Sequence, residues 1–286
     1  MATEILGHVI NVLMLSSIYV LVALGFALVF SIMRIMNFAH GAIYMIGGFV
    51  CYNFWVPLGL GPWLSLLATM IVIGAFGLVL ERVCFRPFRK DFEKAVIMAI
   101  ALVIILKTGA DLTVGAHSKS MPPIVSGGLQ VGPYVIGADR LIVFLIAAAL
   151  LGGMMLFIKK TRIGQAILAI AQDHDGAALM GINTDRVSAL VCALGCALAG
   201  LAGGLVGSVL VLHVSIADAM LVKIIAVVII AGIGSIGGIW AGGLAMGTLD
   251  TLGPYFLPNV VSDPLSLALV VLILVLRPQG LFGQET

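Results

Sequence analysis

The sequence predicts an all-α polytopic membrane protein with about eight or nine transmembrane helices, some of them broken or re-entrant at glycine-rich stretches. Hydrophobic residues make up 62% of the 286 residues, against roughly 45–50% in a soluble domain, and the mean hydropathy is +1.22. Several apolar runs are as long as the ~20 residues that a helix needs to cross a bilayer. These runs do not alternate with a period of two, which favours a helix bundle over a closed β-barrel. We expect a single transmembrane domain over residues 1–286.

The expected helices are the apolar segments, taken in order along the chain and with ends placed to within about 2–4 residues. They cover residues 5–33, 35–56, 62–82, 95–115, 140–158, 187–210, 219–233, 238–253 and 262–276. The glycine-rich stretch 232–243 is also compatible with a re-entrant turn between two half-helices. Eight crossings plus broken elements therefore fit the sequence as well as nine crossings.

Basic residues gather in two connections between these segments and predict the orientation of the chain. One connection runs from Glu81 to Lys94 and the other from Lys159 to Arg186, and together they hold most of the 15 Lys and Arg residues. Positive charges are retained on the cytoplasmic side of short loops. We therefore expect both connections, with a loop at 159–186, and the C-terminus in the cytoplasm, and the N-terminus outside.

The longest connection on the expected outer side is the loop at 116–139. It contains Pro122-Pro123, followed by the strand-like stretch "LQVGPYVIG" from Leu129 to Gly137. Apolar residues interrupted by a glycine–proline turn are typical of a hairpin. We expect this loop to be ordered as a small lid on the outer face.

The stretch "GIGSIG" from Gly232 to Gly237 matches the G-x-G-x-x-G pattern of dinucleotide sites, but its context is wrong. That pattern needs a strand before it and an acidic residue about 20 residues further on, and Asp250 follows too soon. Small residues four apart instead predict close packing of helix backbones. The pairs are Gly200/Gly204, Gly203/Gly207, Gly238/Gly242 and Gly243/Gly247.

The stretch "MNFAHG" spaces Asn37, His40 and Gly41 at i, i+3 and i+4, hence on one face of the expected helix. Polar groups at membrane depth usually face the bundle interior or a cavity. Two interpretations stay open: the two side chains bond to backbone and hold helices together, or they line or gate a translocation path. We take these residues as path candidates, together with Gly234 and Ser235 from the second glycine-broken hairpin.

The remaining charges inside the apolar segments are given structural interpretations. Lys107 and Asp111 are four apart and are expected to pair within the bundle. Asp218, Lys223 and Asp250 lie near segment ends and are expected to reach the interface by snorkelling.

No catalytic pattern is present in the sequence, so we do not expect an enzyme. There is no H-E-x-x-H, no G-x-S-x-G and no G-x-x-x-x-G-K-[ST], and hence no P-loop for ATP. The five histidines are scattered, and Cys192 and Cys196 share a helix face without a metal-ligand spacing, which favours packing.

The segment "QDHDGAALMGINTDR", from Gln172 to Arg186, is a short polar-edged island in an apolar chain. Asp173 suits a helix N-cap, Asp175 suits the first turn, and Gly181 suits the left-handed residue that ends a helix. They predict a helix over 173–180, about 12 Å long. A helix this short is marginal alone in water and presents small apolar residues outward, so we expect it to dock into a partner.

Four stretches of the sequence are similar to one protein family. The island and the segment after it, Ile167 to Gly207, resemble the cytoplasmic loop and following helix of ABC importer permeases for branched-chain amino acids. Ser17 to Phe49, Ala231 to Gly243 and Leu276 to Gly283 match the same family. The resemblance covers nearly the whole chain and is greatest to the shorter permease subunit, while Lys107 and Asp111 depart from the family's pattern.

The resemblance implies an ABC importer permease fold in the bacterial inner membrane and a set of partners. These would be a second homologous permease, two cytoplasmic ABC ATPases, an extracytoplasmic solute-binding protein and the lipid bilayer, with no nucleic acid. The ATPases would use ATP and Mg²⁺, and this chain would bind no cofactor and no metal. The island would be the coupling helix, with Asp173, Ala177, Ala178, Met180, Gly181, Ile182, Asn183, Asp185 and Arg186 at the ATPase.

Other functions compete with this interpretation. An ion-coupled secondary transporter would need an intramembrane acid, for which Asp111 and Asp250 are the candidates. A permease of the same family for amides or urea would share the coupling loop, and an intramembrane enzyme would need a nucleophile–base pattern that the sequence lacks.

Overall fold

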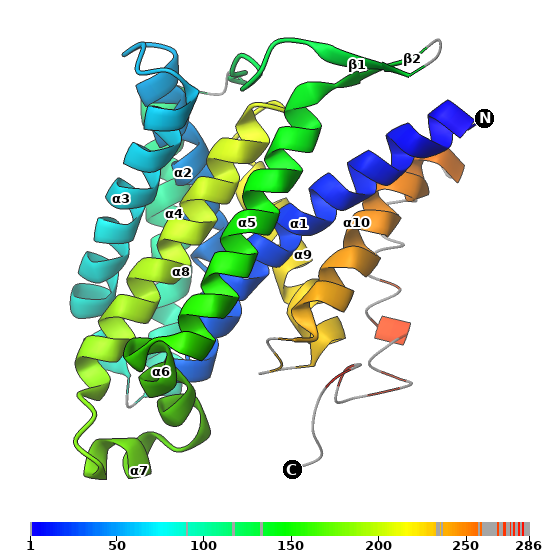
Figure 1. Cartoon of the computed structure of the whole chain (residues 1–286). Helices are drawn as coiled ribbons and strands as arrows, with labels where there is room; N and C mark the ends of the chain where they lie inside the picture. The colour runs from blue at the N-terminus through cyan, green and yellow to red at the C-terminus, as the bar shows by residue number, and fades with distance from the viewer. Residues whose placement is uncertain are drawn as a thin grey trace.

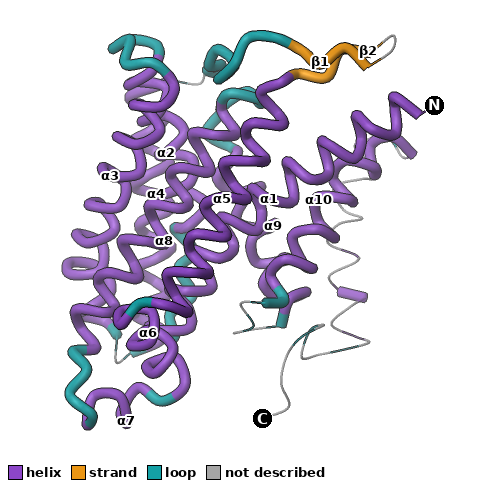
Figure 2. Tube along the Cα trace, in the orientation of Figure 1, coloured by secondary structure: helices purple, strands orange, loops and turns teal. Residues whose placement is uncertain are grey.

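The computed structural model describes residues 2–89, 91–115, 118–131, 134–232, 235 and 237–256, together with residues 258, 268, 271, 272, 275, 277, 280 and 282. Over these residues the protein is a helix bundle with one small hairpin (Figures 1 and 2). The helices are α1 (Ala2–Met33), α2 (His40–Trp55), α3 (Pro62–Leu80), α4 (Phe92–Val114), α5 (Ala138–Lys160), α6 (Arg162–Gln172), α7 (His174–Leu179), α8 (Thr184–Gly207), α9 (Ile216–Ala231) and α10 (Ile239–Phe256). The all-α class predicted from the sequence is confirmed, while the count of eight or nine transmembrane helices stays a prediction.

Five helical segments in the described part of the chain are long and apolar enough to cross a membrane. They are Ile5–Met33, Pro62–Phe88, Phe92–Val114, Ala138–Lys160 and Thr184–Gly207. Helices α2 and α9 have 16 residues each and α10 has 18, shorter than the ~20 of a full span. Helices α9 and α10 correspond to the half-helices expected on either side of the glycine-rich stretch, whereas α2 is shorter than the crossing expected over 35–56. The expected segment at 262–276 lies largely outside the described residues.

The chain between α1 and α2 turns back into the bundle before α2 begins. The Nε2 atom of His40 lies 3.2 Å from the carbonyl oxygen of Val22, which is roughly 16 Å up α1 from Met33. Residues 34–39 cover this rise in an irregular conformation, within the about 20 Å that such a stretch can span. The helix expected from residue 35 therefore starts only at His40.

Helix α8 is the centre of the bundle and packs against α1, α2 and α3 through glycines. A Cβ added at Gly47 of α2 would lie 2.2 Å from the Cα of Gly200, and one added at Gly203 would lie 2.1 Å from the carbonyl oxygen of Tyr44. The backbones of α2 and α8 therefore touch without side chains between them. This confirms the packing role predicted for the glycine pairs in α8.

The outward faces of α3, α4 and α5 remain apolar and exposed in the isolated chain. Ile71, Ile97, Ile104, Ile105 and Leu156 are among these exposed side chains. No water-soluble face of this size would be so apolar, so these helices present their sides to lipid or to another membrane subunit.

The loop before α5 forms the expected hairpin at one end of the bundle. Strands β1 (Gly128–Val131) and β2 (Tyr134–Gly137) pair antiparallel. The preceding stretch is tied to the α8–α9 connection, because the backbone N–H groups of Lys119 and Leu212 each donate to the other's carbonyl oxygen at 2.9 and 2.8 Å. The hairpin lies at the opposite end of the bundle from α7 (Figure 1).

Candidate functional site

Helices α6 and α7 form the loop that the sequence predicted as the docking element, and side-chain caps fix its shape. The carboxylate of Asp173 accepts hydrogen bonds from the backbone N–H groups of Asp175 and Gly176 at 3.1 and 3.0 Å. Asn183 caps α8 in the same way, accepting from the backbone N–H of Arg186 at 3.0 Å. The predicted N-cap of α7 is therefore correct, although the helix is His174–Leu179 and shorter than expected.

The exposed tip of this loop differs from the one predicted. Ala177 is only 6% exposed and packs into its own chain, so the prediction that it faces outward is wrong. Leu179 and Met180 are 88% and 84% exposed, and Ala178 is exposed beside them. Only one side of α7 packs against the protein, and of these four residues only Ala177 lies on that side.

The turn after α7 has the left-handed glycine that the sequence predicted. Gly181 has a φ of +84°, and its N–H donates to the carbonyl oxygen of Ala178 at 3.0 Å. The N–H of Ile182 then donates to the carbonyl oxygen of Ala177 at 3.1 Å. Ile182 is half-buried against the core, while Arg186 is exposed.

Asp185 anchors the loop to the connection between α3 and α4. Its carboxylate accepts from the guanidinium of Arg89 at 2.9 Å and lies 3.7 Å from that of Arg86. Both arginines also pair with Glu81, which is fully buried and directly follows α3. The network thus joins a buried carboxylate at the end of α3 to the first turn of α8.

The path candidates near the start of α2 are buried in the bundle. Asn37 is 1% exposed and His40 is 0% exposed, so the predicted interior placement holds. Asn37 precedes α2, however, so the expected common helix face does not exist. The amide oxygen of Asn37 accepts from the N–H of Ala39 at 3.1 Å, and Gly41 lets α2 approach the carbonyl oxygen of Ala217.

The second group of path candidates lies between α9 and α10. Gly232 ends α9 with a φ of +91°, and the hydroxyl of Ser235 accepts from the N–H of Gly238 at 3.2 Å. Gly234 lies outside the described residues. The helical conformation is interrupted between α9 and α10, as the glycine-rich sequence predicted.

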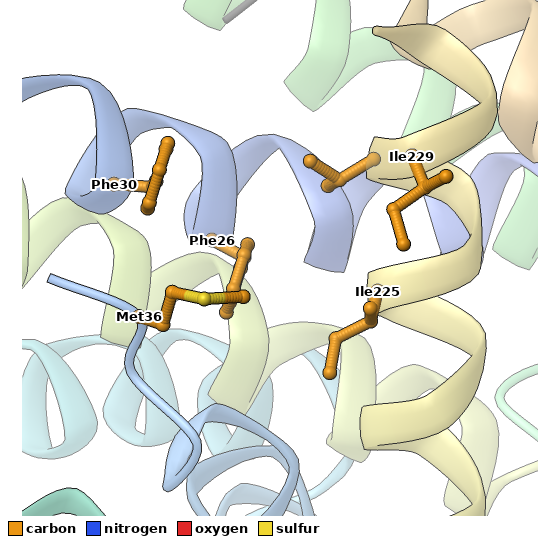
Figure 3. Close-up of a pocket in the computed structure, with 6 residues that line it drawn as sticks. Phe26, Phe30, Met36, Ile225 and Ile229 are labelled. Carbon is orange, nitrogen blue, oxygen red and sulfur yellow. The ribbon is translucent and has the colours of Figure 1, made fainter. Parts of the chain in front are cut away.

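Two cavities lie one after the other along the seam between α1 and α9. The inner cavity is the one nearer Met33 at the end of α1. It has a volume of about 30 Å³, is apolar, and is lined in part by a residue of the irregular stretch before α2 (Figure 3). Its walls are Phe26, Phe30, Met36, Ile225, Val228 and Ile229.

The outer cavity is larger, about 90 Å³, and has polar groups on its wall. Tyr19 of α1, Tyr44 of α2 and Lys223 of α9 line it. Tyr44 is fully buried. Of the predicted path residues that the structure describes, none lines either cavity, although Met36 adjoins Asn37.

The intramembrane charges form pairs between helices rather than the arrangement predicted. Lys107 pairs with Asp218 of α9 at 2.5 Å, not with Asp111. Lys223 pairs with Asp250 of α10 at 2.7 Å, and Asp250 is only 8% exposed, so the snorkelling predicted for these two residues is wrong. Partners so far apart along the chain cannot be found from helical spacing.

Sequence reasoning also missed residues that the structure brings to these sites. Leu179 has no polar signature, and Tyr19 and Tyr44 look like ordinary apolar positions. Glu81 and Arg89 carried a signal, since an acid that ends an apolar run just before arginines suggests a buried carboxylate with its own counter-ions.

Comparisons with known proteins agree over almost the whole length of the chain. The family model described as "Branched-chain amino acid transport system / permease component" matches residues 8–276. The high-affinity branched-chain amino acid transport system permease protein LivH of Salmonella typhimurium is 33% identical over 98% of this chain and 96% of its own length. The corresponding protein BraD of Pseudomonas aeruginosa is 32% identical over the same shares, and a probable LivH permease of Methanocaldococcus jannaschii is 28% identical over 94% of this chain and 90% of its own.

No solved structure matches the chain. The family model and the first two relatives each cover most of its length, and the described residues include five helical segments long and apolar enough to cross a membrane. The chain therefore belongs to the family of permease components of branched-chain amino acid transport systems.

Proposed function

We propose that this chain is a permease subunit of an ATP-driven importer for branched-chain or related small amino acids, in the cytoplasmic (inner) membrane of a bacterium. A second homologous permease would complete the translocation path, and two cytoplasmic ATPases would bind and hydrolyse ATP with Mg²⁺. The names of the relatives support the solute class. The observation that carries the proposal is the exposed apolar tip of α7 on a loop held in shape by caps.

The coupling element would be α7 together with the turn after it. Leu179 and Met180 expose nearly all of their surface, and apolar side chains that are exposed side by side are typical of an interaction site. Ala178 lies beside them and brings the helix backbone close to that partner. Asp173, Gly181 and Asn183 would hold this surface in shape without needing to touch the ATPase.

The same assignment fixes the orientation. With α7 in the cytoplasm, the start of α1 and the hairpin lie at the outer end (Figure 1). The hairpin and the loop before it would then contact the extracytoplasmic solute-binding protein. The basic residues of the α3–α4 connection and of α6 would be cytoplasmic, as their charge favours.

The translocation path would follow the seam between α1 and α9. Irregular backbone at membrane depth is tolerated only where protein buries it or where it lines a cavity, and transporters place their sites at such breaks. Residues 34–39 and the break after Ala231 are two such places. Asn37, His40, Gly41 and Ser235 would act there by holding the broken backbone in place beside the path.

Substitution of Ala178 tests the docking of α7. In proteoliposomes holding the whole complex, Ala178→Glu should abolish leucine uptake and the ATP hydrolysis that loaded binding protein stimulates. A larger side chain at a tight contact costs about 1–3 kcal/mol, and an unpaired buried charge costs more. The permease should still insert, because no membrane segment is altered.

Ala178→Ser is the matched control, since it keeps a small side chain and should keep uptake. Wild-type uptake by Ala178→Glu would overturn the assignment. So would a structure of the complex in which Leu179 and Met180 touch no ATPase residue.

A further inference from the structure

Three polar groups from three different helices meet beside the outer cavity. The ammonium of Lys223 on α9 lies 2.7 Å from the carboxylate of Asp250 on α10 and 3.3 Å from the hydroxyl of Tyr19 on α1. The Tyr19 hydroxyl donates to the same carboxylate oxygen. Ionisable residues inside membrane segments are costly and usually serve a solute or ion path, so this cluster needs an explanation beyond packing.

A fourth polar group in the same cavity has no partner. The hydroxyl of Tyr44 on α2 is buried and makes no hydrogen bond within the described structure, although Tyr44 lines the cavity. A buried hydroxyl without a partner costs about 1–3 kcal/mol. An orphan hydroxyl on a residue that lines the same cavity as Lys223 indicates that something else hydrogen-bonds to it during the working cycle.

The rest of the cavity wall is hydrocarbon. Its apolar side chains come from α1, α8, α9 and the connection between α8 and α9, and include Ile18, Val206, Leu210, Ile216 and Met220. The cavity wall thus carries one cation and two hydroxyls, with the Asp250 carboxylate bonded to the cation, and is otherwise apolar.

We propose that this cavity is the subsite at which the permease itself binds the solute, as a zwitterionic α-amino acid with an apolar side chain. The Lys223 ammonium and the Tyr44 hydroxyl would hold the solute carboxylate, and the Asp250 carboxylate would hold the solute ammonium. The apolar wall would take the hydrocarbon side chain. The inference rests on the proposed function for the solute class and adds the residues that recognise it.

The charge balance of the cluster explains why an ion pair suits this task. The Lys223–Asp250 pair carries no net charge, and an amino-acid zwitterion carries none either. When the pair opens, each of its charges meets an opposite charge on the solute, so no charge is left unpaired in a low-dielectric site. The cavity as it stands has room for several water molecules, and the closed pair keeps the two charges from the solute until it opens.

A second interhelical ion pair provides a matched control. Lys107 of α4 and Asp218 of α9 also join a lysine to an aspartate across two helices, and neither residue lines the inner or the outer cavity. If ion pairs of α9 only hold helices together, breaking either pair should lower stability, more so for the buried Asp250 than for the 57% exposed Asp218, and should leave leucine recognition unchanged. If the outer cavity binds the solute, only the Lys223–Asp250 pair should matter for recognition.

The sharpest variant is Tyr44→Phe, which removes only the orphan hydroxyl. A purely structural role predicts an unchanged or slightly higher melting temperature and unchanged transport, because no hydrogen bond is lost. We expect instead that the Kd for radiolabelled leucine, measured on the purified permease–ATPase complex without binding protein, rises about threefold to tenfold. The amount of leucine transported per ATP hydrolysed in proteoliposomes should fall as the Kd rises.

Lys223→Gln and Asp250→Asn test the two charges separately. Each should weaken leucine binding about tenfold to hundredfold, the usual effect of losing a hydrogen bond to a charged group. In Asp250→Asn, isocaproate, which lacks the ammonium group of leucine, should compete with leucine better than it does in the wild type. Lys107→Gln and Asp218→Asn should leave both the Kd and this competition unchanged.

Wild-type leucine binding by Tyr44→Phe would overturn the inference even if the charge variants failed to fold. The inference would also be overturned if Lys223→Gln and Lys107→Gln changed the Kd for leucine equally. In both cases leucine uptake by the wild-type complex would leave the proposed function standing, whereas a wild-type complex that imports no branched-chain amino acid would refute that function directly.

Discussion

Gly181 determines how α7 ends. Its φ of +84° lies in the left-handed region, which a residue with a Cβ enters at a cost of roughly 1–2 kcal/mol. A Cβ at this position would meet no other atom within 4 Å. The conformation alone, and not crowding, therefore favours glycine here.

A graded series at Gly181 tests this argument. Gly181→Asn should retain most of the ATP hydrolysis stimulated by loaded binding protein, Gly181→Ala should retain less, and Gly181→Val should retain least. Asparagine tolerates the left-handed form and a β-branched residue does not.

Gly152→Val is the control for this series, because Gly152 on α5 also has open space around it and has no positive φ. Equal activity of Gly181→Val and Gly152→Val would show that the turn after α7 plays no part in coupling.

The connection between α3 and α4 and the start of α8 act together as one element. Their shared ion pairs have unequal environments, since Glu81 is fully buried while the side chain of Asp185 is 54% exposed. Leaving a buried charge without its partner typically costs about 3–5 kcal/mol, and an exposed pair contributes about 0–1 kcal/mol. The two ends of the network should therefore have different functions.

Arg89→Gln should lower the melting temperature of the purified permease, because it removes a partner from Glu81. Asp185→Asn should leave the melting temperature nearly unchanged and reduce leucine uptake per ATP hydrolysed, because it loosens the loop that holds α7. Arg82→Gln, an exposed position in the same connection, should change neither. A large stability loss in Asp185→Asn would contradict this division.

Elements determined by neighbouring residues were predictable from the sequence, and contacts between distant segments were not. The Asp173 cap, the turn at Gly181 and the hairpin each depend on a few adjacent residues, so composition and spacing were sufficient. The later start of α2 depends on tertiary contacts, including the bond between His40 and the Val22 carbonyl. The ion pairs of Lys107 and Lys223 join helices whose order in space no periodicity reveals.

The whole molecule separates the two contact surfaces proposed for it by the full length of the bundle. The tip of α7 lies at one end and the β1–β2 hairpin at the other (Figure 1). The stretch before the hairpin is fixed independently, through the paired backbones of Lys119 and Leu212. The hairpin is thus separable from the rest of the outer surface.

Replacing residues 129–137 by a short glycine linker should abolish the stimulation of ATP hydrolysis by loaded binding protein and leave the basal rate unchanged. The bonds of Lys119 and the helices that contact the ATPases remain, so assembly should be normal. The measurement is ATP hydrolysis in proteoliposomes with and without binding protein. Full stimulation in the deletion variant would show that the hairpin only covers the outer end.

The glycine contacts of α8 have a mechanical consequence. Where two backbones touch, as at Gly47 and Gly200, there is no flexible side chain that could change rotamer and absorb a displacement. Helix α8 begins at Thr184, directly after the loop that carries α7, and its 24 residues extend about 36 Å. A displacement of the loop should therefore move α8 along its whole length as a rigid body. Helices α1, α2 and α3, which pack against α8, should move together with it.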